Sequence, residues 1–187
     1  MERISRRLSE LISIPSVTGD EVAIRDRLAE MLDAMGLAVD AFEADLSRLT
    51  ADPAFPGMEV DRNVLPVVCA TLNPDAPGPH PMLSGHIDVV PAGDPTSWSS
   101  DPFTPRLDGS RLYGRGACDM KGGVVAILET LDSLIDTGHR GPVSVALVPS
   151  EEDGGAGTLA VIRRGIEADV VVIPEPTNLE IITAHAG

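Results

Sequence analysis

A short apolar run in this chain ends in potential metal ligands at residues 83–91, which read LSGHIDVVP. The stretch places an imidazole, His86, and a carboxylate, Asp88, two residues apart where the apolar run gives way to a loop. In an extended segment, side chains two residues apart point to the same face. We therefore predict that the two side chains act together, because strand ends are where metalloenzymes place ligands.

The rest of the chain alternates between apolar runs of strand length and segments with helical periodicity. This alternation predicts an α/β fold with a mostly parallel, mixed sheet that carries helices on both faces. A length of 187 residues is sufficient for one domain with a sizeable core, so we expect one domain over residues 1–187. The expected strands are 38–43, 63–72, 82–85, 143–148 and 170–173, and the expected helices are 4–12, 22–36, 120–135 and 158–164.

Two connections are expected to lack regular structure. Residues 45–61 contain Pro53, Pro56 and Gly57 and are interpreted as an exposed excursion between strands. A long loop is expected between the strand that ends near Gly85 and the helix that starts near residue 120. Residues 18–21 (TGDE) are expected to cap the second helix.

Acidic residues follow the next two central strands and precede the long helix. Glu151 and Glu152 come after one strand and Glu175 after the next, while Asp119 stands where a helix dipole favours a carboxylate. In open α/β sheets, ligands bind beyond the carboxyl ends of the strands. We therefore expect these carboxylates to meet His86 at one edge of the sheet.

These residue types suit a hydrolytic metal centre. Catalytic zinc usually takes three protein ligands of the His, Asp or Glu type, and His86, Asp119 and Glu175 would form one such set. With Asp119 as a bridge, Glu152 could hold a second ion, and two ions would clamp a hydroxide and polarise a carbonyl. Glu151 would then be left unligated beside the metals, as a general base requires.

Asp88 has a separate expected role, which is to hold the tautomer of the neighbouring imidazole from behind. Each feature alone has a simpler explanation: a solvated His-x-Asp pair, a polar turn at residues 151–152, a helix cap at Asp119 and a loop acid at Glu175. Their joint occurrence at three strand ends and one helix start favours the metal centre.

The overall charge excludes some classes of partner. The formal net charge of −15 and the pI near 4.4 argue against binding to nucleic acid or to an anionic membrane. The N-terminal residues show neither a signal peptide nor a membrane span, so we expect a cytoplasmic protein. Cys69 and Cys118 are too few for a disulfide framework or a cysteine zinc site and are expected to be reduced bystanders.

Longer motifs around the proposed ligands resemble the M20 metallopeptidase family, and the resemblance covers nearly the whole chain. The motifs are HIDVVP at residues 86–91, LYGRGACDMKGG at residues 112–123, EEDGG at residues 151–155 and EPT at residues 175–177. The resemblance implies a zinc-peptidase-like catalytic domain, often with a cis peptide bond after the bridging aspartate. It implies the same roles by position, with His86, Asp119, Glu152 and Glu175 as metal ligands, Glu151 as general base and Asp88 as the orienting aspartate.

The EPT motif and the insert around residues 45–55 are most similar to the acetylornithine deacetylase and succinyl-diaminopimelate desuccinylase branch of the family, which serves amino-acid biosynthesis. This likeness implies hydrolysis of a small N-acyl amino acid with two Zn²⁺ ions, for which Co²⁺ could substitute. An M20 dipeptidase or carboxypeptidase acting on a dipeptide shares the same centre and is an alternative. A non-catalytic metal-binding fragment is another.

Members of the family are considerably longer than this chain. After a segment like residues 182–187 they continue into a lid domain through which they form homodimers, so we expect the chain to be the N-terminal part of the catalytic domain, with the lid domain absent. Without a late histidine of the family, a second metal would keep only Asp119 and Glu152. We therefore expect one tightly bound ion and little or no deacylase activity from the chain alone. His185 is expected to be structural.

Overall fold

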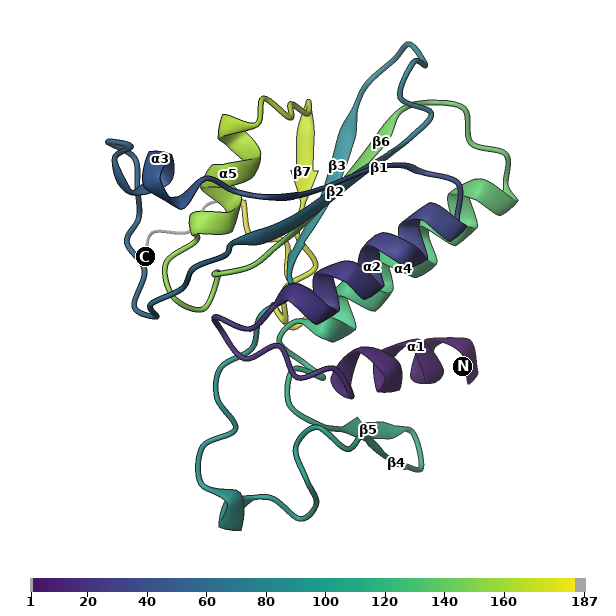
Figure 1. Cartoon of the computed structure of the whole chain (residues 1–187). Helices are drawn as coiled ribbons and strands as arrows, with labels where there is room; N and C mark the ends of the chain where they lie inside the picture. Colours follow the sequence, from purple (N-terminus) through teal and green to yellow (C-terminus); the bar gives the residue numbers. More distant parts are fainter. Residues whose placement is uncertain (1, 184–187) are drawn as a thin grey trace.

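The structure is a computed structural model that describes residues 2–183, so His185 lies outside the described residues. Figure 1 shows a central sheet with helices on both sides and a small hairpin below it. The helices are α1 (Glu2–Ile12), α2 (Val22–Ala34), α3 (Leu46–Thr50), α4 (Lys121–Asp136) and α5 (Ala156–Arg163). The strands are β1 (Ala38–Glu43), β2 (Pro66–Leu72), β3 (Pro81–His86), β4 (Arg106–Asp108), β5 (Arg111–Tyr113), β6 (Val143–Val148) and β7 (Val170–Val172).

The main sheet has five strands in the order β1-β2-β6-β3-β7. β3 lies parallel to both β6 and β7, whereas β2 is antiparallel to both β1 and β6. β1, β6, β3 and β7 therefore point in one direction and β2 alone points in the other. This is the mixed, mostly parallel sheet that the alternation of strands and helices predicts.

Helices cover both faces of this sheet, as expected. On one face, α1, α2 and α4 bury residues such as Leu11, Leu28 and Leu131 in the larger hydrophobic cluster. On the other face, α3 and α5 close a smaller cluster that contains Leu49 and Leu159. The two helical layers hold the sheet, and therefore the ends of its strands, in place.

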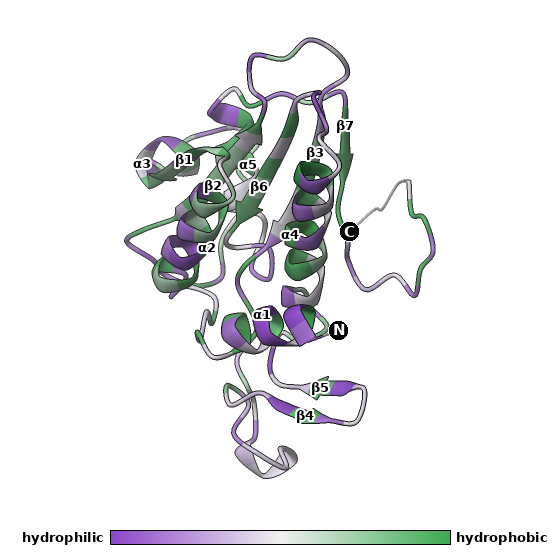
Figure 2. Cartoon of the chain, turned by 90° about the vertical axis from the view of Figure 1, so that its right-hand side faces the viewer, coloured by the Kyte–Doolittle hydropathy of each residue, from purple (hydrophilic) through white to green (hydrophobic). Residues whose placement is uncertain are grey.

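Side chains of the two central strands β2 and β6 point alternately to the two faces of the sheet, and so they contribute to the two clusters in turn. In β6, Val145 and Leu147 face the larger cluster while Ala146 and Val148 face the smaller one. Strands buried on both faces are expected to be apolar throughout, and every residue of β6 is buried. Figure 2 shows the apolar character of β6 and also of the edge strand β7, whose residues are exposed.

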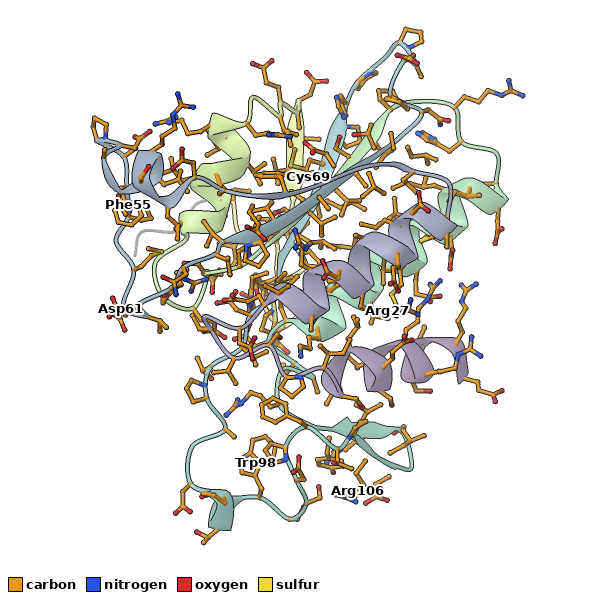
Figure 3. All side chains as sticks on the ribbon, in the orientation of Figure 1. Arg27, Phe55, Asp61, Cys69, Trp98 and Arg106 are labelled. Atoms are coloured by element: carbon orange, nitrogen blue, oxygen red, sulfur yellow. The ribbon has the colours of Figure 1, made fainter. Side chains whose placement is uncertain are left out.

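Two connections contain more structure than expected. The excursion at residues 45–61 begins with the short helix α3, which Asp45 caps by accepting the backbone N–H groups of Ser47 and Arg48. The long loop after β3 contains a single 3-10 turn (Pro95–Ser97) and the β4–β5 hairpin. Figure 3 places Trp98 and Arg106 in this part of the chain, below α1.

The expected cap of α2 is not formed by the side chains of residues 18–21. The N-cap residue is Glu21, and its side chain makes no capping hydrogen bond to the helix. The Glu21 carboxylate instead accepts the backbone N–H of Gly19, and the Thr18 hydroxyl donates to Asp88. Glu21 therefore stabilises the turn before the helix, and Thr18 joins this turn to the loop after β3. Among the described helices, none is long and apolar enough to span a membrane.

Candidate metal centre

Three parallel strands bring the predicted ligands to one edge of the sheet. His86 is the last residue of β3 and is paired in register with Val148, the last residue of β6. Glu151 and Glu152 follow β6, and Glu175 follows β7. Because neighbouring parallel strands end at the same edge, residues up to 89 positions apart in sequence share one site.

The imidazole of His86 lies at the centre of this group and is 2% exposed. Its Nε2 atom is 3.0 Å from Oδ1 of Asp119, 3.9 Å from Oε1 of Glu175 and 4.0 Å from Oε2 of Glu151. Its Nδ1 atom is 2.9 Å from the backbone carbonyl oxygen of Asp88. One ring nitrogen therefore faces the carboxylates while the other is held by the chain behind it.

Asp88 lies behind the imidazole and links it to the loop after β6. Its carboxylate is 3.6 Å from Nδ1 of His86, so the nearer partner of that nitrogen is the Asp88 backbone rather than the side chain. The carboxylate accepts the backbone N–H groups of Glu151 and Glu152, each at 3.2 Å, and the Thr18 hydroxyl. Asp88 thus orients the two glutamates as well as the histidine.

The charges of this group shift several pKa values. Burial alone would lower the pKa of His86, but the carboxylates of Asp88 and Asp119 outweigh it and raise the pKa to about 10. Burial raises the pKa of Glu152 and of Glu175, and in each case the nearby carboxylates add to the shift while His86 opposes it. The group therefore holds more negative charge than the single imidazole can balance.

Three of these side chains form a compact set of donors. One ligand atom from each of His86, Asp119 and Glu152 lies within 4.8 Å of the other two. Glu175, which we expected beside His86 and Asp119, also approaches the same imidazole nitrogen, to 3.9 Å. The compact set therefore contains Glu152, which we expected at a second ion, rather than Glu175. Glu175 lies close to the same imidazole nitrogen.

Asp119 is carried by the segment that leads into α4. The helix begins at Lys121, with Met120 as its N-cap residue, so Asp119 precedes the helix rather than opening it. The peptide bond between Asp119 and Met120 is cis, in agreement with the family resemblance. The Asp119 side chain is 56% exposed, and so it faces the open side of the site.

A cavity of about 970 Å³ opens above the cluster. Its floor contains His86, Asp119, Glu151 and Glu175, and its walls include Ile162 of α5 and further apolar side chains. No lysine or arginine is among the described residues that line it. A small polar molecule with an apolar part would therefore meet carboxylates at the bottom and hydrocarbon at the side.

The donor set fits a divalent metal ion. An imidazole nitrogen and carboxylate oxygens are the ligands of catalytic zinc sites, and here they lie together without a lysine or arginine on the cavity lining to balance them. Burial is the main cause of the raised pKa values of Glu152 and Glu175, and the neighbouring carboxylates add to it. A bound cation would favour the charged form of both side chains.

Sequence reasoning missed two residues that position the site. Thr18 donates to the Asp88 carboxylate, and its sequence context resembled a helix cap. The sulfur of Met120 accepts the backbone N–H of His86 at 3.1 Å and is fully buried. Both contacts join segments more than 30 residues apart in sequence, and no local pattern marks such partners.

Comparison with known proteins identifies the family of the chain. The sequence profile of "Peptidase family M20/M25/M40" matches residues 82–186. A succinyl-diaminopimelate desuccinylase of Methylobacterium sp. (strain 4-46) is 37% identical over 180 residues, which are 90% of this chain and 41% of that protein. The enzyme of the same name from Variovorax paradoxus (strain S110) is 31% identical, over 96% of this chain and 45% of its own length. The chain thus spans less than half the length of these curated relatives.

Solved structures share the fold. Human carnosine dipeptidase 1 superposes with a TM-score of 0.73 at 23% identity and covers 92% of this chain and 38% of its own. An M20 family metallo-carboxypeptidase from Sulfolobus solfataricus gives a TM-score of 0.72 at 23% identity, over 93% of this chain and 37% of that one. At this level of identity the likeness establishes the architecture.

Proposed function

This chain belongs to peptidase family M20/M25/M40, and from that membership we propose that it carries the metal-binding part of an amide hydrolase that removes the acyl group of an N-acyl amino acid. The observation that carries the proposal is the compact donor set of His86, Asp119 and Glu152, with Glu151 beside it. The substrate class is supported by the relatives at 31–37% identity, which are named succinyl-diaminopimelate desuccinylases.

His86, Asp119, Glu152 and Glu175 would hold the metal, which we propose to be Zn²⁺, with Co²⁺ able to replace it. When bound, such ions supply Lewis acidity, which polarises an amide carbonyl and makes water a stronger acid. The donors around them are fixed by the ends of β3, β6 and β7 and by the segment before α4.

Glu151 is assigned the role of general base. Its side chain is 52% exposed at the floor of the cavity, where it can reach a water molecule and a substrate. Its carboxylate would take a proton from the attacking water and deliver it to the amine nitrogen that leaves. Asp88 positions this base by accepting its backbone N–H, while Oδ1 of the same carboxylate stays near His86.

The proposal extends to the domain and its partners. Residues 1–187 would correspond to the N-terminal part of the catalytic domain of the relatives, and the substrate to a small molecule. Homodimer formation, as the family resemblance implies it, would depend on sequence that the chain does not span. A dipeptidase reaction is the less favoured alternative, because the dipeptidase structures resemble this chain in fold alone, at 23% identity.

Two measurements test the proposal. Titration of the chain with Zn²⁺ should reveal a tight site that is lost in His86→Ala. A chimera in which this chain replaces the matching segment of the Methylobacterium relative should hydrolyse N-succinyl-diaminopimelate, and its Glu151→Gln variant should bind Zn²⁺ without turnover. Absence of Zn²⁺ binding by the chain, or full activity of the Glu151→Gln chimera, would contradict the proposal.

A further inference from the structure

A buried guanidinium lies beneath the loop that carries the two site glutamates. The side chain of Arg62 is fully buried although the residue lies in the connection between β1 and β2, directly after the polar excursion of residues 45–61. Its Nη1 is 3.0 Å from Oε1 of Glu21, and its Nη2 is 3.1 Å from each carboxylate oxygen of Asp153. A buried charge requires partners of this kind, because it has lost its hydration.

Asp153 ties this guanidinium to the ends of the glutamate pair. Its carboxylate accepts the hydroxyl of Ser150, and Ser150 has a left-handed backbone, with φ of 67°. Glu151 and Glu152 are the two residues between Ser150 and Asp153, so the hydrogen bond closes a small loop around them. A conformation that is unfavourable for serine is thus held by contacts from Asp153.

The excursion packs against the same loop with its backbone. The N–H of Val60 donates to Asp153 at 3.2 Å. Gly154 has φ of +135°, and a Cβ atom on it would lie 2.5 Å from the carbonyl oxygen of Gly57. In Figure 3 the labelled side chains of Phe55 and Asp61 mark where the excursion runs, on the side of the molecule occupied by α3. The excursion therefore contacts both the backbone of the loop, at Gly154, and the buried carboxylate of Asp153.

From these contacts we infer that Arg62 is a positioning residue for the catalytic loop, acting through Asp153 to hold Glu151 and Glu152 at the metal centre. The inference rests on the proposed roles of those two glutamates. The Asp88 carboxylate accepts the backbone N–H groups of both glutamates. Arg62 holds Asp153, and Asp153 in turn accepts the Ser150 hydroxyl on the other side of the pair. Arg62 reaches Glu21 and Asp153 with two different nitrogens of its planar fork, a spacing that the compact ammonium group of lysine does not reproduce.

The test compares local amide exchange with metal affinity in the 187-residue chain. In Arg62→Met without metal, exchange of the Glu151 and Glu152 amides should accelerate at least about tenfold relative to amides of β2 such as that of Val68. Affinity for Zn²⁺ alone, measured by calorimetry, should fall roughly tenfold, the lower range for residues that support metal ligands. Arg62→Lys should behave like Arg62→Met, and full recovery by lysine would overturn the inference.

Two controls separate positioning from general stability. Leu131→Ala weakens the core of α4 and should accelerate exchange throughout the fold without changing Zn²⁺ affinity. Glu21→Gln keeps the oxygen that accepts from Gly19 and Arg62 and leaves the Asp153 contacts in place, so it should retain wild-type affinity. If Arg62→Met does not fold, Asp153→Asn provides the same test and should loosen the same two amides.

The inference would be overturned if Arg62→Met and Leu131→Ala accelerated exchange of the two glutamate amides equally. It would also be overturned if Glu21→Gln lost as much Zn²⁺ affinity as Arg62→Met. If the wild-type chain bound no Zn²⁺, the proposed function would fail, whereas the exchange measurement would still decide whether Arg62 holds the loop.

Discussion

Nε2 of His86 lies 3.0 Å from Oδ1 of Asp119, so two atoms that would bind a metal are within hydrogen-bonding distance of each other. The pKa of His86 rises to about 10 in this environment, because the carboxylates of Asp88 and Asp119 outweigh burial. Metal binding must therefore displace the imidazole proton.

This displacement gives the site a pH-dependent affinity. Below pH 10 the metal-free histidine is charged, and only its neutral form can act as a ligand, so binding at pH 7 should release about one proton. We expect the apparent Zn²⁺ affinity to rise roughly tenfold per pH unit between about pH 6 and 8. Calorimetry in buffers of different ionisation enthalpy measures the released proton. An affinity that does not vary over this range would contradict the assignment of His86. The same titration should give close to one tightly bound ion per chain.

The adjacent glutamates are expected to respond differently to the same substitution. Glu152→Gln should weaken Zn²⁺ binding by about tenfold or more, because Glu152 belongs to the compact donor set. Glu151→Gln should leave that affinity within about twofold of wild type but reduce kcat of the chimera by about 10²–10⁴-fold, as for the loss of a general base. Each variant serves as the control for the other, and a reversed pattern would exchange the two roles.

Asp88→Asn should destabilise the metal-free chain by about 1–3 kcal/mol, because one of the glutamate N–H groups loses its charged acceptor. Burial alone would raise the pKa of Asp88, but the charge of His86 and the backbone N–H groups outweigh it and lower the pKa from 3.8. A lowered pKa means that the stabilisation is complete above the unfolded value and is lost as the pH falls through the folded value. Urea unfolding with a chelator present should show the full difference above about pH 5 and a shrinking one below 3.8.

Gly123 lies where α4 passes the segment that carries Glu175. A Cβ atom on it would clash with the carbonyl oxygen of Pro174 and would lie 2.8 Å from Cε of Met120. Gly123→Ala should therefore displace residues 174–175, cost about 1–3 kcal/mol of stability through overpacking and weaken Zn²⁺ binding. Ser133→Ala, at an exposed position of the same helix, should change neither quantity. Wild-type affinity in Gly123→Ala would show that Glu175 is not held by this contact.

The two cysteines should differ in reactivity. Cys118 is exposed, whereas Cys69 is buried in β2, and burial raises the pKa of the Cys69 thiol to about 12. Because the thiolate is the reactive form, a thiol reagent should modify one group in the folded chain and two in denaturant. Rapid modification of both in the folded chain would indicate that the sheet opens readily around β2.

The fold could be predicted from sequence wherever burial imposes a pattern. β6 is buried on both faces and is apolar except for Ser144. Polar residues follow the apolar runs of β3, β6 and β7, and they mark the ends of these strands. Parallel pairing then brings His86, Glu151 and Glu175 together without further information. The metal centre is therefore largely a property of strand order.

The support beneath that centre could not be predicted in the same way. Arg62 is one cation directly after a polar excursion, and its partners Glu21 and Asp153 lie 41 and 91 positions away. Thr18 looked like a helix cap and instead contacts Asp88. Contacts of this kind depend on which loops meet in three dimensions, and no periodicity in the sequence records that.

The edge strand β7 has a consequence for how the chain behaves in concentrated solution. Its residues and the following Ile173 are each about half exposed, and the strand pairs on one side with β3. An uncharged β-branched run of this kind is a template for aggregation, which natural sequences limit with flanking gatekeeper residues. Asp169 and Pro174 stand immediately before and after the run. The charge of Asp169 and the missing N–H of Pro174 therefore limit the aggregation-prone segment to four residues. Asp169 and Pro174 thus limit the length of exposed strand with which a second chain could pair.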